Sequence, residues 1–159
     1  MACFFNHPIR IVCPNVVTQC SNDIINPVIL NDYAFFNNTG DTEIAPDTTI
    51  PVTLVVNRGS NITQSITTTG AIGLQPGVYE VTYSVTGTIP AGGTIETELE
   101  LNGVTISGST LTVSQTAGET ISMSQTLIIN VPAISTLQLL NAGAEETTFS
   151  YAGVTLNRL

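Results

Sequence analysis

The segment Thr94–Leu101, TIETELEL, restricts the fold more than any other stretch of the chain. Its positions alternate strictly between a mainly apolar set and three carboxylates, Glu96, Glu98 and Glu100. Successive side chains of a β-strand point to opposite faces, so this pattern predicts a strand with one face toward a core and one toward water. Asn102-Gly103 follows directly, and both residues accept the positive φ of a type I′ turn. The segment therefore predicts a β-hairpin.

The remainder of the chain repeats this period of two and lacks apolar residues at helical spacing. Threonine, valine and isoleucine, whose branched Cβ favours strands, are abundant. We predict a turn at Asn37–Asp41 and an antiparallel sandwich or barrel, because no crossover helices are available for a parallel sheet. The predicted strands are Val28–Phe36, Ile50–Val56, Ile62–Thr68, Val78–Thr86, Ile95–Leu101, Val104–Ser107, Thr110–Gln115, Thr120–Val131, Ser135–Leu140 and Thr147–Leu156.

Length and charge limit the functional classes. The 159 residues are enough for one domain, and only 9% of them are charged. The net charge of −9 leaves no cluster of Lys and Arg for phosphates, so we expect neither nucleic acid nor an anionic membrane as partner. No apolar run reaches the length of a membrane span, and the first residues do not form a basic segment followed by an apolar one. We therefore expect no ordinary secretory signal.

Two turn motifs carry a resemblance to a known family. Leu74–Tyr79, LQPGVY, and Leu101–Val104, LNGV, stand within a region from about residue 31 to 159 that resembles the jelly-roll heads of the TNF-like and complement globular-head superfamily. It is most similar to the C-terminal head of the BclA-type collagen-like glycoproteins of the bacterial exosporium. The resemblance implies an all-β, TNF-like jelly roll of antiparallel sheets, commonly trimeric, with Tyr79, Tyr83 and Tyr151 near packing surfaces. The chain departs from the BclA type because it has no Gly-X-Y stalk.

The first 25 residues differ in composition from the rest. We predict an extended N-terminal connector over residues 1–25 and the jelly-roll domain over 26–159, because Pro8 and Pro14 disfavour a helix. A terminal strand must fray or pair with a sheet edge to satisfy its backbone groups. The connector's candidate docking residues are Ile9, Ile11, Val16 and Val17.

All three cysteines, Cys3, Cys13 and Cys20, lie in this connector, together with the only histidine, His7. Three interpretations remain open. The thiols could be incidental; they could hold zinc with His7, although the spacing lacks a close CxxC pair; or they could cross-link neighbouring chains. An odd number cannot pair fully within one chain, and disulfides indicate an oxidising final environment. We take the third interpretation as the prediction.

A cysteine-bearing connector before a threonine-rich jelly roll also resembles the subunits of bacterial endospore appendages, the Ena family. That resemblance implies a spore-surface fibre, extracellular after mother-cell lysis, in which the connector docks on neighbouring subunits by β-strand complementation. The implied partners are copies of the chain itself, as a homopolymer or as stacked trimers, with a spore-surface anchor protein and a tip protein. The alternative function is a trimeric exosporium or adhesin-like head that binds a glycan or receptor.

Catalysis and cofactors receive little support from the sequence. His7 is the sole imidazole, and Cys13-Pro14 is not a CxxC redox pair. The glutamates of Thr94–Leu101 match a solvated strand face better than a glycosidase pair. Calcium is a weaker alternative at the acidic loop around Asp41–Asp47, which lacks the spacing of a calcium loop. We predict that the chain is not an enzyme and that it has no resident metal or cofactor.

Overall fold

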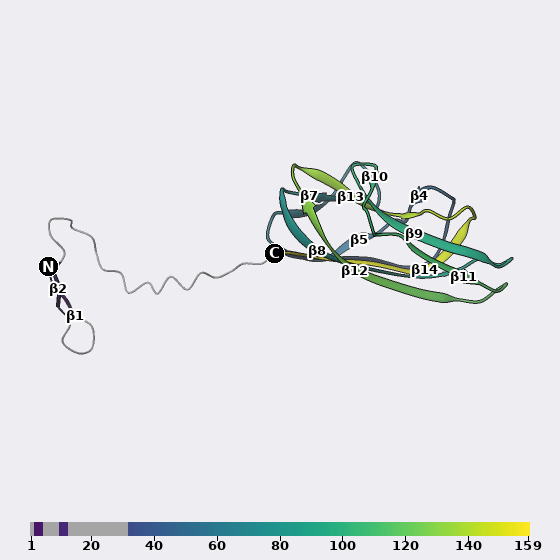
Figure 1. Ribbon diagram of the computed structural model, residues 1–159, viewed down its shortest axis with the longest axis horizontal. Coiled ribbons are helices and arrows are strands. Elements are labelled where there is room, and N and C mark those ends of the chain that lie inside the picture. Colours follow the sequence, from purple (N-terminus) through teal and green to yellow (C-terminus); the bar gives the residue numbers. More distant parts are fainter. Residues whose placement is uncertain (1, 5–9, 13–31) are drawn as a thin grey trace.

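The computed structural model describes residues 2–4, 10–12 and 32–159, and the body formed by residues 32–159 is a sandwich of two antiparallel sheets (Figure 1). The five-stranded sheet has the order β12-β8-β14-β3-β5. It consists of β3 (Tyr33–Ile44), β5 (Thr53–Arg58), β8 (Gly77–Thr88), β12 (Ile121–Val131) and β14 (Thr147–Arg158).

The seven-stranded sheet has the order β10-β9-β13-β7-β6, with β11 also paired to β9 and β4 to β13. Its strands are β4 (Thr48–Thr49), β6 (Ile62–Gln64), β7 (Ile72–Leu74), β9 (Gly93–Leu101), β10 (Val104–Thr105), β11 (Leu111–Gln115) and β13 (Ser135–Asn141). The prediction of an all-β, antiparallel jelly roll is confirmed. Among the described residues no helix is long and apolar enough to cross a membrane.

The core lies between the two sheets and follows from the period-two pattern. In β8 every second residue from Tyr79 to Val85 is buried, and the residues between them are half-buried on the outer face. The same alternation places the glutamates of β9 outward and Ile95, Thr97 and Leu99 inward. The largest fully buried side chains are Tyr79, Tyr83, Phe36, Phe149, Ile50, Ile62, Ile72, Leu74, Ile95, Leu99, Leu137 and Leu139.

The predicted Asn-Gly hairpin is confirmed. Leu101 pairs with Val104, and Asn102 and Gly103 have φ values of 54° and 75°. The predicted turn at Asn37–Asp41 is wrong, because these residues lie inside β3. A register shift between Phe149 and Tyr151 of β14 lets the ladder continue past this point.

The N-terminal segment contains a short ladder of its own. β1 (Ala2–Phe4) pairs antiparallel with β2 (Arg10–Val12), and Cys3 stands opposite Ile11. In these six residues the two strands satisfy some of each other's backbone groups. The extended connector over residues 1–25 stays a prediction, because its other residues lie outside the described part of the chain. The boundary predicted near residue 25 lies outside the described residues.

Candidate self-association surfaces

The outer face of the five-stranded sheet is the first candidate surface. Its cross-strand register places small polar and aromatic side chains in continuous rows. One row runs Thr126, Thr82, Thr155, Phe35 and Val56, and the next runs Ser124, Ser84, Gly153, Asn37 and Thr53. We call the surface made by these two rows, together with Ser122, Thr86, Tyr151 and Thr39, the hydroxyl face.

Hydrogen bonds between hydroxyl groups join β8 to β12 on this face. The Oγ1 atoms of Thr82 and Thr126 lie 2.7 Å apart, and 2.9 Å separates Thr86 Oγ1 from Ser122 Oγ. Cross-strand Thr–Thr and Thr–Ser hydrogen bonds of this kind each stabilise a sheet by roughly 0.2–1 kcal/mol. These short side chains also lose little rotamer entropy when another surface covers them.

Tyr151 and Gly153 form the aromatic part of the hydroxyl face. A Cβ atom at Gly153 would lie 2.4 Å from the Tyr151 hydroxyl oxygen and 2.9 Å from its Cζ atom. The tyrosine ring therefore lies over Gly153 and covers the backbone that a larger residue would shield. Only glycine at this position lets the ring lie flat on the sheet.

The hydroxyl face carries no charged side chain, although the body is strongly acidic. Arg10 and Asp23 balance each other in residues 1–31, so the net charge of −9 belongs to residues 32–159. Glu80 and Arg58 stand at the next row of the sheet, beyond the charge-free rows. A surface without charge is where two copies of an acidic protein can meet with the least repulsion, and depletion of charge is typical of interface centres.

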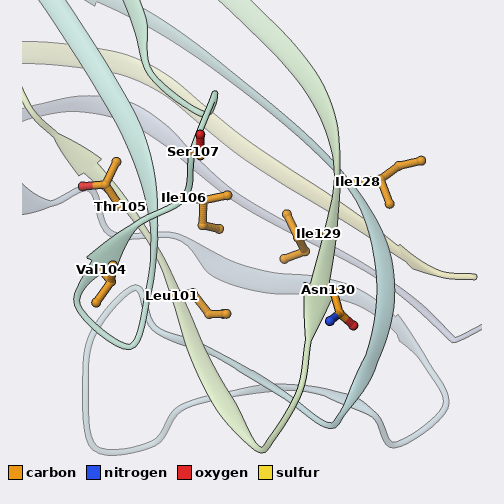
Figure 2. Close-up of a pocket in the computed structure, with 8 residues that line it drawn as sticks. All are labelled: Leu101, Val104, Thr105, Ile106, Ser107, Ile128, Ile129 and Asn130. Atoms are coloured by element: carbon orange, nitrogen blue, oxygen red, sulfur yellow. The ribbon is translucent and has the colours of Figure 1, made fainter.

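The second candidate surface is an apolar groove between the edges of the two sheets. It has a volume of about 360 Å³, which lies within the range of ligand pockets. In Figure 2 the side chains of Leu101, Ile106 and Ile129 converge on the space between β12 and the segment after β10. Val104 and Ile128 stand at its rim and are 68% and 66% exposed. We call this space the β10–β12 groove.

The groove lies along the second half of β12, beyond the side-chain hydrogen bonds that hold its first half. The turn from β11 into β12 is held by Glu119, whose carboxylate accepts hydrogen bonds from the backbone N–H and the hydroxyl of Thr116. These bonds lower the pKa of Glu119. Farther along β12, Gln125 donates to the Gly108 carbonyl at 2.6 Å. Beyond Gln125, no hydrogen bond within residues 32–159 joins β12 to β10.

Asp32 fixes the point at which the body begins. Its buried carboxylate accepts the backbone N–H groups of Ser60 at 3.2 Å and Asn61 at 2.9 Å, together with the Asn61 amide. The Asn61 backbone bond is the main reason that the pKa of Asp32 lies below its usual value. Gly59 has a φ of 89°, and a Cβ there would overlap the carboxylate. The Asp32 carbonyl also accepts the N–H of Arg158, so the first residue of the body is held beside the C-terminal strand.

The predicted connector residues fall mostly outside the described residues. Cys3 lies in β1 and Ile11 in β2. Cys13, Cys20, Ile9, Val16 and Val17 lie outside the described residues, as does His7, so neither the predicted cross-links nor the docking contacts are tested.

Two of the three tyrosines expected near packing surfaces are core residues. Tyr79 and Tyr83 are fully buried, and only Tyr151 lies on the hydroxyl face. The Tyr79 hydroxyl donates to the Gln75 carbonyl at 2.7 Å, which closes the LQPGVY turn. The Tyr83 hydroxyl donates to the Ser109 carbonyl, and burial raises the pKa of Tyr83 to about 12. Both rings are therefore packed inside the body and are not exposed for contact with another copy of the chain.

The acidic candidates form no metal-binding group. No cluster of three His, Cys, Asp or Glu side chains suited to a metal lies in the part of the chain that the structure describes. Glu98 instead accepts hydrogen bonds from the hydroxyls of Thr105 at 3.0 Å and Thr110 at 3.5 Å.

The sequence analysis did not predict the groove, although the sequence of its residues contains a recognisable pattern. Val104 and Ile106 follow the Asn-Gly turn, and Leu127, Ile128 and Ile129 form an apolar run that breaks the alternation of β12. Such a break marks a strand with apolar side chains on both faces, which indicates a second contact surface.

The comparisons with known proteins concern the fold. No protein-family model matches the chain, and no curated protein matches it. Among solved structures, the crystal structure of murine APRIL at pH 5.0 has a TM-score of 0.61 at 9% identity, covering 81% of this chain and 99% of that one. The globular domain of zebrafish complement 1qA protein has a TM-score of 0.61 at 11% identity, covering 80% of this chain and 96% of that one.

A third structural neighbour is a vertex protein. The PRD1 vertex protein P5 has a TM-score of 0.51 at 16% identity, covering 82% of this chain and 98% of that one. Each neighbour is matched over almost its whole length, and the identities are too low to indicate more than the fold. Residues 32–159 therefore form a jelly roll of the TNF-like and C1q-like kind.

Proposed function

We propose that the chain is a structural subunit that self-assembles into a fibre on the bacterial spore surface, as an endospore appendage does. The jelly-roll body supplies the repeating unit, and the N-terminal connector docks on a neighbouring subunit. Cys3, Cys13 and Cys20 then convert that contact into a covalent one. The role is structural rather than catalytic, and the localisation is the spore surface after mother-cell lysis.

The observation that carries the proposal is that the cysteines and the core-forming residues lie in separate parts of the chain. All cysteines and the balanced charges lie within residues 1–31, whereas residues 32–159 form a closed core that needs none of them. The body has a hydroxyl face without charge on an otherwise acidic surface, which supports contact between like copies. A head-to-tail contact that does not close into a ring propagates as a helical filament.

The test is microscopy of the purified full chain. We expect filaments by negative staining, and we expect covalent ladders on a non-reducing gel that disappear with a thiol reductant. Deleting residues 2–20 is expected to leave a folded body that does not polymerise, because the deletion removes no residue of the core. Filaments of normal length from that deletion would contradict the proposal.

A discrete recognition head is the second candidate. It is favoured by the likeness to the complement globular domain and by a groove of ligand-pocket size. In that case the hydroxyl face closes a trimer and the connector attaches the head to another protein. Light scattering separates the two functions: a fixed mass of three chains supports the head, and mass that grows with concentration supports the fibre.

A further inference from the structure

We propose that Asn102 is a site of spontaneous deamidation, that its side-chain hydrogen bonds to β13 set the rate of the reaction, and that the product loosens β10 from the wall of the β10–β12 groove. The reaction needs only water as a co-reactant. The modification alters one turn of the body, whether or not copies of the chain assemble.

The turn between β9 and β10 is open to this reaction. Asn102-Gly103 is the only Asn-Gly pair in the chain, and both residues are exposed. Deamidation begins when a backbone nitrogen attacks the side chain of the preceding asparagine, and a side chain on the attacking residue hinders that approach. Glycine has none, and a Cβ built at Gly103 would meet nothing within 4 Å apart from the adjoining residues. The position of the Asn102 carboxamide therefore limits the attack.

The reaction exchanges ammonia for water. The Gly103 backbone nitrogen loses its proton to a base in the solvent and bonds to Cγ of Asn102. The Cγ–Nδ2 bond then breaks, and the leaving amine takes up a proton and departs as ammonia, which leaves a cyclic imide between the two residues. Water opens the imide at Cγ to give aspartate, or at the main-chain carbonyl carbon to give isoaspartate, whose main chain runs through Cβ and Cγ. No group is oxidised or reduced.

Three hydrogen bonds hold Asn102 against the first residues of β13. Its Oδ1 accepts the backbone N–H of Thr136 at 2.8 Å, and its Nδ2 donates to the Ser135 hydroxyl oxygen at 3.0 Å. Its own backbone N–H donates to the Thr136 carbonyl at 2.8 Å. Because a backbone N–H can only donate, the Thr136 bond fixes which end of the carboxamide is the oxygen. We call the two side-chain bonds the Asn102 clamp.

The Asn102 clamp opposes the attack. Both ends of the carboxamide are bound to β13, so Cγ turns toward the Gly103 nitrogen only after the clamp opens, and reaction requires that close approach. Ser135 is buried, and its hydroxyl donates to the Ala133 carbonyl at 2.9 Å, which leaves its oxygen as the acceptor for Asn102. The free energy of one ordinary hydrogen bond corresponds to about fivefold in rate. The folded turn should therefore react more slowly than the unfolded chain.

Either product weakens the attachment of β10. Isoaspartate adds one carbon atom to the main chain of a two-residue turn, and the length of that turn fixes the pairing of Leu101 with Val104. Aspartate keeps the chain length, but it replaces the amide that donates to Ser135 and adds a charge two residues from Glu100. β10 resists such changes poorly, because it has only two residue pairs with β9 and lies at the end of the sheet.

The segment after the turn forms one wall of the β10–β12 groove. Val104, Thr105 and Ile106 line the groove, as Figure 2 shows. The Ile106 N–H donates to the Leu99 carbonyl at 2.9 Å and anchors the far end of this segment. On the other side of the groove, β12 is held by eleven residue pairs with β8. A chemical change at the turn therefore moves one wall of the groove and leaves the other in place.

The first test measures the rate of deamidation in the full chain. Purified protein is incubated at mildly alkaline pH, either folded or unfolded in urea, and the deamidated fraction at Asn102 is followed by mass spectrometry of proteolytic peptides. We expect the folded natural chain to react at least about tenfold more slowly than the unfolded chain, and folded Ser135→Ala to react about fivefold faster than the folded natural chain. The matched control is Ser114→Ala, which removes an exposed serine hydroxyl from the same sheet and should leave the rate within about twofold.

Three results would overturn the proposal. Equal rates in the folded and unfolded natural chain would show that the Asn102 clamp has no effect. An unchanged rate in folded Ser135→Ala would show that the clamp does not limit the reaction, and a slower rate would show that the Ser135 hydroxyl assists it. Circular dichroism checks that both variants are folded. The comparison of folded with unfolded protein uses the natural chain, so it decides the outcome even where Ser135→Ala is unstable.

The second test measures the consequence for the groove. Natural protein is aged until part of it has deamidated, and the product, which has one more negative charge, is separated by anion exchange. We expect amide hydrogen exchange in Val104–Ile106 to be about tenfold faster in the isoaspartate fraction than in unmodified protein, and about threefold faster in Asn102→Asp. Exchange in Tyr79–Val85, in the core of β8, is the internal control and should not change. Equal exchange at Val104–Ile106 in all three forms would show that the modification does not reach the groove.

Discussion

The two edges of the five-stranded sheet are built differently. At the β5 edge, side-chain hydrogen bonds join β5 to β6: Gln64 Oε1 accepts the Leu54 N–H at 2.8 Å, and the Asn57 amide donates to the Ile62 carbonyl at 3.0 Å. At the β12 edge, Gln125 makes one such bridge, and the strand from Leu127 to Val131 has none among residues 32–159. One edge is therefore protected against a further strand, and the other is left free above an apolar groove.

The difference shows which edge the protein keeps for pairing. An unprotected edge risks aggregation, and natural sheets usually cover or charge it. Here two polar side chains, Gln64 and Asn57, cover the β5 edge, whereas β12 keeps exposed Ile128 beside its free backbone. If the open edge were accidental, substitutions at the two edges would have similar effects on assembly.

The largest effect is expected from Asp32→Ala, which releases the turn that carries β6 across the β5 edge. The carboxylate accepts two backbone N–H groups, and hydrogen bonds to a charged group contribute about 1.5–3 kcal/mol. We expect a loss of about 2–3 kcal/mol in the free energy of unfolding at pH 7, measured by chemical denaturation. Asp41→Ala, at an exposed position, is the control and is expected to change it by less than about 0.5 kcal/mol.

The effect of Asp32 depends on pH. Its pKa is lower in the folded chain than in the unfolded chain, so its contribution is complete above the unfolded pKa of about 4 and is lost as pH falls through the folded pKa. The difference in stability between the natural chain and Asp32→Ala should therefore shrink below about pH 4. A difference that is constant from pH 7 to pH 2 would show that the carboxylate acts through packing alone.

A smaller effect is expected from Gln64→Ala, which exposes the β5 edge directly. The variant loses the bond to Leu54 and a longer one, 3.4 Å, to the Val52 carbonyl. We expect about 1–2 kcal/mol of destabilisation and, because the backbone is now free, disordered aggregation above that of the natural chain in light scattering. Gln64→Glu keeps the acceptor for Leu54 and should lie between the two. Aggregation unchanged in Gln64→Ala would mean that β5 needs no protection.

The sequence predicted those parts of the fold that depend on short-range patterns. The alternation in β9 and the Asn102-Gly103 turn placed a hairpin with the correct register, because the side-chain period and the positive φ values are local properties. The predicted turn at Asn37–Asp41 was wrong because pairing between strands outweighed the local turn preference. Turn-forming residues were held in β3 by pairing with β14 across a register shift.

The surfaces were less predictable, because they depend on which strands become neighbours. The three residues Ile72–Leu74 were not predicted as a strand, since β7 is short and is defined by its partners β6 and β13. The groove joins Leu101 and Ile129, which are far apart in the sequence and meet only where two edges diverge. Asp32 was not singled out, because its partners Ser60 and Asn61 belong to a distant turn. The predicted connector contacts stay predictions.

Gln125→Ala tests the β12 edge in the way that Gln64→Ala tests the β5 edge. Gln125 donates to the Gly108 carbonyl, so its removal is expected to cost about 1 kcal/mol. It should also lengthen the free part of β12 and thereby favour strand pairing at this edge. We expect assembly at an equal or lower protein concentration than for the natural chain, whereas Gln64→Ala should not assist ordered assembly. Slower or incomplete filament growth in Gln125→Ala would show that the bridged region is itself part of the contact.

The smallest effect on stability is expected from Gly153→Ala, which tests whether the face between the two edges also takes part in association. The added methyl would lie 2.4 Å from the Tyr151 hydroxyl, so the ring must lift from the sheet, while the core beneath is unchanged. Because Tyr151 is half-buried and its hydroxyl end can move, we expect a change of about 0.5 kcal/mol or less in unfolding free energy. A raised ring would nevertheless disturb a flat contact between copies, and we expect the dissociation constant measured by sedimentation to rise about tenfold.

The control is Thr39→Ala at an exposed position of the same face, which adds no atoms and should leave association within a factor of about two. Unchanged association in Gly153→Ala would exclude the hydroxyl face and leave the groove as the surface through which copies meet.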